Sequence, residues 1–319
     1  MKLLPLLIGA TSILVAMSAT AQSYPTRPVR VLVAQAAGGP TDVVTRIYAT
    51  KMSELLGQQM VVDNRPGAGG SVAGDIVARA PADGYTLCSA ANGTIAIAPN
   101  FLKLSFSVTK DLAPVALIGD SPLALMVHPV LPAASVKELI ALAKAKPGTI
   151  NFASSGLAGT GHLSGELFKM MAGINITHVP YKGAAPALAA VAAGEAQMLI
   201  SGLSSGMPFI QSKRVRAIAV TSAKRVSMLP EVPAIAETVP GYEAGSWYAV
   251  LAPAGTPKAI IERLNRESTK TITDPDVRPK LIATGLELEA LSPDELGKKI
   301  RTETERWGKV VKATGVKQQ

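Results

Sequence analysis

The feature that most constrains the fold is a unit that recurs along the chain: a short apolar strand, a loop of small residues and a helix. The first copy runs from a predicted strand at 29–34, through Gly38-Gly39-Pro40-Thr41-Asp42, into a predicted helix at 43–56. Further strands are predicted at 60–62, 86–90, 123–127, 150–153, 176–179, 197–201, 215–220 and 246–251. Strands that alternate with helices form mainly parallel sheets with helices on both faces. We therefore predict an α/β fold.

The last part of the chain contains helices but no further strands. Predicted helices cover 257–273, 276–284 and 293–314. Helices without a sheet of their own bury their apolar faces against an earlier one, so we expect this tail to fold back on the first sheet. The prediction is a first lobe at 22–120 plus 247–319 and a second lobe at 121–246, with a hinge where the chain crosses between them.

The first 21 residues have the pattern of a secretory signal peptide. Lys2 precedes an apolar run from Leu3 to Met17, and Ala19-Thr20-Ala21 matches the A-x-A site before Gln22. The alternative is a membrane anchor, but the run is short for a span of about 20 residues. We predict cleavage before Gln22 and a periplasmic product.

Composition excludes several classes of partner. The net charge is +9, yet the basic residues are dispersed and aromatic residues make up only 4% of the chain. Nucleic-acid binding needs clustered charge or stacking platforms, so we expect no such partner. The only cysteine, Cys88, lies in a predicted strand and allows no internal disulfide. We expect it to be a small buried residue rather than a catalytic thiolate.

Three loops carry the candidate ligand contacts: Gly38 to Asp42, Asn92-Gly93-Thr94 and Ser154 to Gly161. Each is predicted to follow a strand and precede a helix, which is the edge where open α/β sheets bind ligands. Glycine permits close backbone approach, and the free N–H groups of a helix start attract anions. The loops therefore predict a carboxylate site, with tight turns as the alternative. Thr41 is the better contact candidate, whereas Asp42 fits better as a first-turn acid that favours the helix dipole.

Enzyme patterns fit less well. Gly202-Leu203-Ser204-Ser205-Gly206 matches the G-x-S-x-G nucleophile elbow, but His128, His162 and His178 all precede Ser204, whereas that fold requires the acid and histidine to follow. Three dispersed histidines give no metal-ligand pattern, and Ser164 breaks the dinucleotide motif that starts at Gly159. We predict no catalysis, no metal and no cofactor, with a hydrolase using Ser204 or His162 as the alternative.

Taken in order, a set of short motifs makes the chain resemble the substrate-binding proteins of tripartite tricarboxylate transporters, the TctC-like or Bug family. They are Gly38-Gly39-Pro40-Thr41-Asp42, the run 61–70 (VVDNRPGAGG), the run 81–87 (PADGYTL), Ser154-Ser155-Gly156, His162-Leu163, the run 178–183 (HVPYKG), the run 229–233 (LPEVP) and the run 251–257 (LAPAGTP). The resemblance covers nearly the whole chain after the leader. It departs from the family at Gln35, where an aromatic residue is common, and at Ala189-Ala190, where Thr-Asp is common.

The resemblance implies a two-lobed periplasmic-binding-protein fold, type II-like, that closes on a small carboxylate. The expected ligand-binding residues from the loops and the family together are Gly38, Gly39, Thr41, Asp42, Asn92, Ser154, Ser155, Gly156, Thr160, His162, Tyr181 and Lys182. The ligand is a di- or tricarboxylate, an acidic amino acid or an aromatic acid. We expect a monomer whose further partners are the membrane subunits of such a transporter or, alternatively, a sensor kinase.

Overall fold

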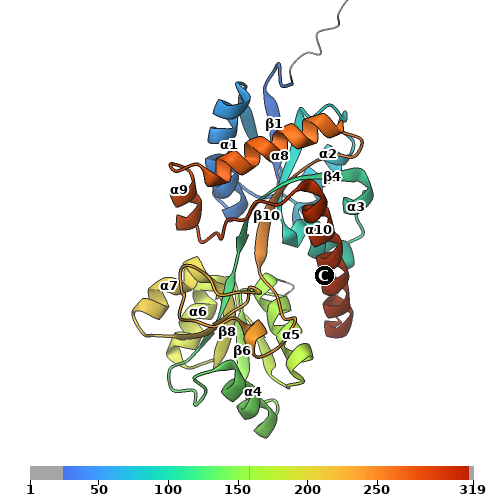
Figure 1. Cartoon of the computed structure of the whole chain (residues 1–319). Helices are drawn as coiled ribbons and strands as arrows, with labels where there is room; N and C mark the ends of the chain where they lie inside the picture. The colour runs from blue at the N-terminus through green and yellow to red at the C-terminus, as the bar shows by residue number, and fades with distance from the viewer. Residues whose placement is uncertain (1–23, 158, 316–319) are drawn as a thin grey trace, which may run out of the picture.

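Two five-stranded sheets, each flanked by helices, lie one beyond the other in the computed structural model of the chain (Figure 1), which describes residues 24–157 and 159–315. The predicted leader at 1–21 lies outside the described residues. Within them, no helix is long and apolar enough to cross a bilayer. The structure is thus the predicted two-lobed α/β fold.

The first sheet has the strand order β2-β1-β3-β10-β4. Its strands are β1 (Val29–Val33), β2 (Met60–Asn64), β3 (Thr86–Ala91), β4 (Leu112–Ser121) and β10 (Ser246–Pro253). Strand β1 is parallel to β2 and β3, whereas β10 is antiparallel to both of its neighbours. The sheet is mixed but mainly parallel, as predicted.

The second sheet repeats this pattern with the order β7-β6-β8-β5-β9. Its strands are β5 (Leu123–Val127), β6 (Asn151–Ser154), β7 (Thr177–Pro180), β8 (Met198–Gly202) and β9 (Arg216–Val220). Here β5 is the antiparallel strand, paired with β8 and β9. Each sheet therefore has its single reversed strand where the chain enters it from the other sheet.

Helices cover both faces of the sheets. They are α1 (Pro40–Leu56), α2 (Ser71–Ala78), α3 (Val108–Asp111), α4 (Val136–Ala145), α5 (Thr160–Ala172), α6 (Ala184–Ala193), α7 (Leu203–Gln211), α8 (Lys258–Thr273), α9 (Arg278–Ala283) and α10 (Pro293–Thr314). On the first sheet, Val31 packs with α1 and α8, whereas its neighbour Leu32 packs with α2 and α10. Burial of both faces explains why the strands are continuously apolar.

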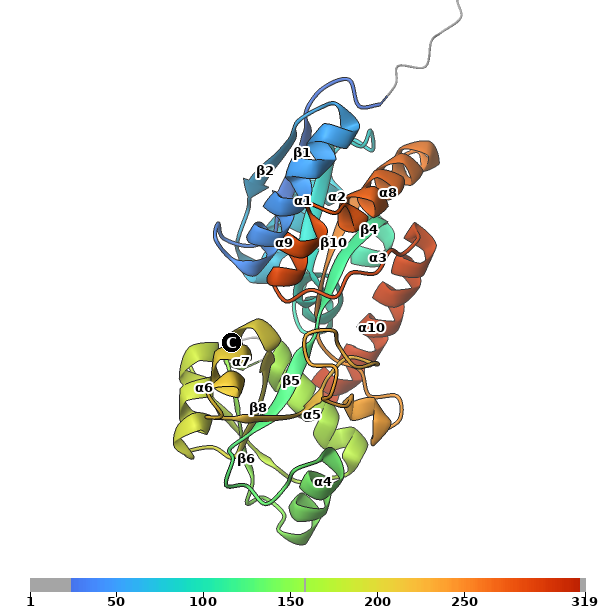
Figure 2. The same ribbon diagram turned by 60° about the vertical axis from the view of Figure 1, so that its left-hand side comes forward.

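The chain crosses between the sheets twice, from β4 to β5 through Pro122 and from β9 back to β10. Figure 2 shows these segments between the lobes, with α10 running beside them to α5. The first sheet takes its strands from 29–121 and 246–253, and the second from 123–220. The exact division at 22–120 plus 247–319 and 121–246 stays a prediction.

Strand β4 is absent from the sequence prediction. Its sequence contains Pro114 and Gly119, both of which are unfavourable inside a strand. In the structure β4 is an edge strand that pairs with β10 alone, so a residue without an N–H is tolerated there.

Candidate functional site

A cavity of about 610 Å³ lies where the glycine loops of the first lobe face the start of α5 in the second. It is lined by Ala34, Gln35, Ala36, Thr41, Pro66, Gly67, Ala68, Gly70, Ala91, Gly93, Thr94, Ile97, Ala98, Phe101, Leu102, Gly159 and Thr160. The volume is in the range of small-ligand sites. The cavity is therefore the candidate binding site, and both lobes contribute to it.

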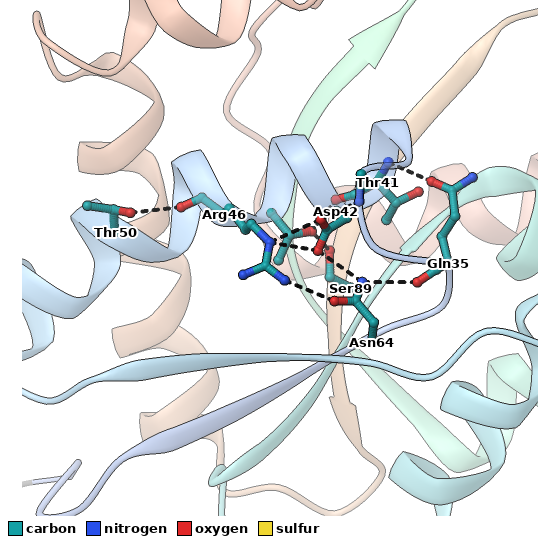
Figure 3. A network of polar contacts seen from close by, with 9 residues as sticks. Gln35, Thr41, Asp42, Arg46, Thr50, Asn64 and Ser89 are labelled. Carbon is teal, nitrogen blue, oxygen red and sulfur yellow. Dashed lines mark hydrogen bonds and ion pairs between the residues drawn. The ribbon is translucent and has the colours of Figure 1, made fainter.

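The first loop is held by Asp42 at the start of α1. Its carboxylate accepts from the Gly38 N–H at 2.8 Å and from Asn64 Nδ2 at 2.9 Å, and it pairs with Arg46 at 2.9 Å (Figure 3). Burial raises the pKa of Asp42, but the hydrogen bonds from Arg46, Gly38 and Asn64 outweigh burial, so its pKa lies below the ordinary value. Asp42 thus shapes the loop, in line with the preference for a structural first-turn acid.

Gln35 lies just after strand β1, and its side chain reaches the start of α1. Its Oε1 accepts from the Thr41 N–H at 2.9 Å, while Gly39 precedes the helix without any side-chain cap (Figure 3). A Cβ at Gly39 would lie 2.5 Å from Gln35 Oε1, so glycine leaves room for this side chain. Gln35 lines the cavity and was not among the predicted contacts, because a lone glutamine before a glycine loop has no distinguishing pattern.

Ser154 and His162 belong to a buried cluster at the start of α5. Ser154 Oγ lies 2.7 Å from His178 Nε2, and the His178 and His162 rings stack at 3.8 Å between centroids. Burial is the main cause that lowers the pKa of both rings, for His178 to about 4. At pH 7 the two rings are therefore neutral. They pack beneath the loop and do not line the cavity.

Loop 154–156 is also tied to the turn after β7. The Tyr181 N–H donates to Ser154 O at 2.9 Å, and the Gly183 N–H donates to Ser155 O at 3.2 Å. Lys182 between them is exposed. These bonds hold the loop that leads into Gly159 and α5.

Asn92 is buried and turned toward the hinge. Its Nδ2 donates to Gly245 O at 2.8 Å, and its Oδ1 accepts from Ser246 Oγ at 3.2 Å. It therefore connects the end of β3 to the crossing segment before β10. Sequence alone cannot reveal this role, because the partner lies 153 positions away.

Of the predicted site residues, Thr41 and Thr160 line the cavity. The others do not line it but build the loops around it or the hinge: Gly38, Gly39, Asp42, Asn92, Ser154, Ser155, Gly156, His162, Tyr181 and Lys182. Their contact with a ligand stays a prediction. The apolar lining at 97–102 was also not predicted, since its residues resemble ordinary core.

Two other places in the structure contain residues of the types that bind anions or act as nucleophiles. A cavity of about 410 Å³ at the hinge contains Lys299, but this ammonium already pairs with Asp120 at 3.0 Å and lies near Glu303. Ser204 of the G-x-S-x-G motif is exposed at the start of α7, and no hydrogen bond joins it to a histidine in the described part of the chain. Residues 24–157 and 159–315 also contain no group of three or more His, Cys, Asp or Glu side chains that could hold a metal ion.

Comparison with known proteins shows to which family the chain belongs. Residues 44–316 match the model of the tripartite tricarboxylate transporter family receptor, TctC. The chain belongs to this receptor family. BugT of Bordetella pertussis is 37% identical over 306 residues, which cover 95% of this chain and 94% of that protein.

Two solved structures of similar proteins contain carboxylates. The protein Rpa4515 of R. palustris with adipate is 39% identical, with a TM-score of 0.73 over 92% of this chain and 99% of that chain. MatC from Rhodopseudomonas palustris with bound malate is 32% identical, with a TM-score of 0.69 over 90% of this chain and 100% of that chain. This TctC-family receptor thus shares its fold with solute-binding proteins.

Proposed function

We propose that this receptor captures a small organic acid between its lobes in the periplasm and delivers it to the membrane subunits of a tripartite tricarboxylate-type transporter. The observation that carries the proposal is the cavity in which the starts of α1 and α5, one from each lobe, contribute Thr41 and Thr160. The adipate and malate in the two similar proteins support the same class of ligand.

The chemistry of the cavity suits an anion. Helix α5 begins after Gly159, which has no side chain to cap the first turn of the helix. A helix start also carries a partial positive charge that stabilises a carboxylate. Threonine hydroxyls add donors, and closure of the lobes would bring the two sets together around one ligand.

Ligand-induced thermal stabilisation tests the proposal on protein that has been unfolded and refolded to remove any retained ligand. A ligand that binds the folded state alone stabilises it by about 2.7 kcal/mol at 100 times its dissociation constant. At roughly 2–4 °C per kcal/mol, this raises the melting temperature by several degrees. We expect at least one acid among di- and tricarboxylates, acidic amino acids and aromatic acids to do so. A response to sugars and to no acid would overturn the proposal.

A pair of variants localises the site. Thr160→Val keeps the size of the side chain but removes its hydroxyl, and we expect it to weaken binding of the acid about tenfold. Thr50→Val is the matched control, because Thr50 is exposed on α1, does not line this cavity and donates its hydroxyl to the Arg46 carbonyl. Equal losses in both variants would contradict the site.

Delivery is tested in cells by uptake of the labelled acid. Deletion of the gene should abolish high-affinity uptake, and the wild-type chain but not Thr160→Val should restore it. Unchanged uptake in the deletion strain would refute transport and favour a sensing role.

A further inference from the structure

Two hydrogen bonds join the lobes directly, away from the ligand cavity. The Ser227 N–H and the Ser227 hydroxyl both donate to Glu287 Oε1, at 2.9 and 2.7 Å. Ser227 follows β9 of the second sheet, whereas Glu287 lies between α9 and α10 in the helical tail. Neither residue lines the ligand cavity. The pair therefore connects parts of the chain that belong to different lobes.

Each member of the pair is anchored in its own lobe. The Glu287 N–H donates to Asp120 O at 2.8 Å, and the Asp120 N–H donates to Glu287 O at 2.9 Å, which fixes Glu287 to β4 of the first sheet. Its neighbour Leu286 is buried in the apolar core around α1 and α8. Val226, next to Ser227, is buried with the side chains of α6 and α7 on the second sheet. The distance between Ser227 and Glu287 thus depends on the relative position of the lobes.

The pair lies on the other side of the crossing segments from the ligand cavity. The loops that line that cavity follow β1, β2, β3 and β6, which stand toward one end of the orders β2-β1-β3-β10-β4 and β7-β6-β8-β5-β9. Glu287 bridges the outer edge of β4, and Ser227 follows β9, at the opposite end of each order. Figure 2 shows the segment between α9 and α10 passing the strands that cross between the lobes. A rotation about the crossings that brings the cavity walls together moves Ser227 and Glu287 apart.

On this side the lobes meet through local contacts around open space. The hinge cavity of about 410 Å³ lies beside the pair, lined by 222–226 from the second lobe and 287–289 from the tail. A Cβ at Gly285 would lie 3.3 Å from the Cβ of Ser204, so the lobes also touch at the start of α7. Because side chains do not fill the space between these contacts, the hydrogen bonds of the pair form a large part of what separation would break.

We propose that Ser227 and Glu287 form a latch that holds the lobes in the arrangement of this structure, and that closure around the acid breaks it. This inference rests on the proposed function. A ligand that needs the closed form binds more weakly in proportion to how rarely the protein adopts that form. The latch therefore lowers the affinity for the acid from outside the ligand cavity.

Loss of the latch should tighten binding. Glu287→Ala removes the acceptor of both hydrogen bonds, and Ser227→Ala removes one of the two donors. A hydrogen bond of ordinary net strength changes an equilibrium constant by roughly two- to tenfold. Calorimetry on refolded protein with adipate, citrate, glutamate and benzoate should show, for each acid that the wild type binds, a gain of this size in Glu287→Ala and a smaller gain in Ser227→Ala.

Two variants at the same hinge cavity are matched controls. Glu289→Ala removes the same charge two residues away, and in the described part of the chain Glu289 makes no hydrogen bond to the other lobe. Ser222→Ala removes a hydroxyl that donates to Lys224 O at 2.7 Å within one loop. Both should bind with wild-type affinity. Unchanged affinity in Glu287→Ala, or an equal gain in Glu289→Ala, would overturn the latch.

A covalent latch tests the converse. In Ser227→Cys with Glu287→Cys, a short bis-methanethiosulfonate reagent should join the two thiols, while the native Cys88 is buried and stays unreactive. We expect the joined protein to lose acid binding, a reductant to restore it, and saturating acid to slow the joining. The same treatment of Ser227→Cys alone should leave binding unchanged.

The outcomes separate the latch from the proposed function. Thiols that do not join in acid-free protein, that join at the same rate with and without acid, or that leave binding intact once joined would overturn the latch alone. Binding of no acid by the wild type would overturn both.

Discussion

The stacked histidines beneath the loop of the second lobe should make the stability of the protein depend on pH. His178 has a pKa of about 4, lowered first by burial, then by the charge of His162 and then by that of Lys169. In the unfolded chain a histidine titrates near 6.5. The unfolded state therefore binds a proton more readily than the folded state between these two values, so the stabilisation is complete above pH 6.5 and is lost as the pH falls toward 4.

The size of the effect follows from the two pKa values of His178. Each pKa unit corresponds to about 1.4 kcal/mol, so the full difference would amount to roughly 3 kcal/mol. The His178 ring is partly exposed, so solvent screens part of this difference. We therefore expect a loss of about 2 kcal/mol from His178 between pH 7 and pH 4.

Urea unfolding at several pH values between 7 and 4 measures this loss. His178→Gln removes the titrating group while keeping a side chain that can bond to Ser154, so its free energy of unfolding should fall less steeply with acid than that of the wild type. Ser154→Ala is the control. It should lose about 1 kcal/mol at every pH through the missing hydrogen bond and keep the wild-type slope, because burial of His178 persists. Parallel curves for wild type and His178→Gln would refute the reasoning.

Buried contacts lead to three further predictions, two for substitutions and one for chemical labelling. Gly161→Ala should cost about 1–3 kcal/mol in urea unfolding, because the new Cβ would lie 2.4 Å from the Ile200 carbonyl oxygen, whereas Gly93→Ala meets no atom within 4 Å and should cost less. Asp42→Asn should cost about 1–3 kcal/mol, since one of the two acceptor oxygens becomes an NH2 group and the charge that pairs with Arg46 is lost, and a change below 0.5 kcal/mol would contradict the anchoring role of Asp42. Cys88 is buried and its pKa is raised to about 12, so iodoacetamide should label it only after unfolding; rapid labelling of the native protein would place it outside the core.

The strands that follow the alternating pattern were predictable, because each of them is a short apolar run followed by a loop of small residues. Both signals are local in the sequence. Strand β4 was not predictable, since Pro114 and Gly119 interrupt its run and their tolerance depends on an edge position that only the assembled sheet creates. The motif at Gly202 shows the converse: its local pattern matches a nucleophile elbow, yet Ser204 lies on an exposed helix start, and within residues 24–157 and 159–315 no histidine is bonded to it.

The candidate site was predictable in position but less so in composition. Glycine loops at strand ends located the cavity, and Thr41 and Thr160 do line it. The orientation of Asn92 depends on a carbonyl far away in the sequence, and His162 depends on a stacking partner from another strand. Such contacts are fixed by packing between elements, so no local pattern encodes them.

The two tryptophans of the chain lie on different elements, Trp247 at the start of β10 just after the crossing between the sheets, and Trp307 on α10. Each has a cation near its ring: Lys299 is 5.9 Å from the ring centroid of Trp247, and Arg306 is 5.8 Å from that of Trp307. Indole emission depends on the charges around the ring, and of the two pairs only Lys299 and Trp247 belong to different elements, α10 and β10. Trp247 and Lys299 lie on different elements, so if the lobes move on binding we expect the emission of Trp247 to change, and ultraviolet fluorescence without an attached dye measures that change.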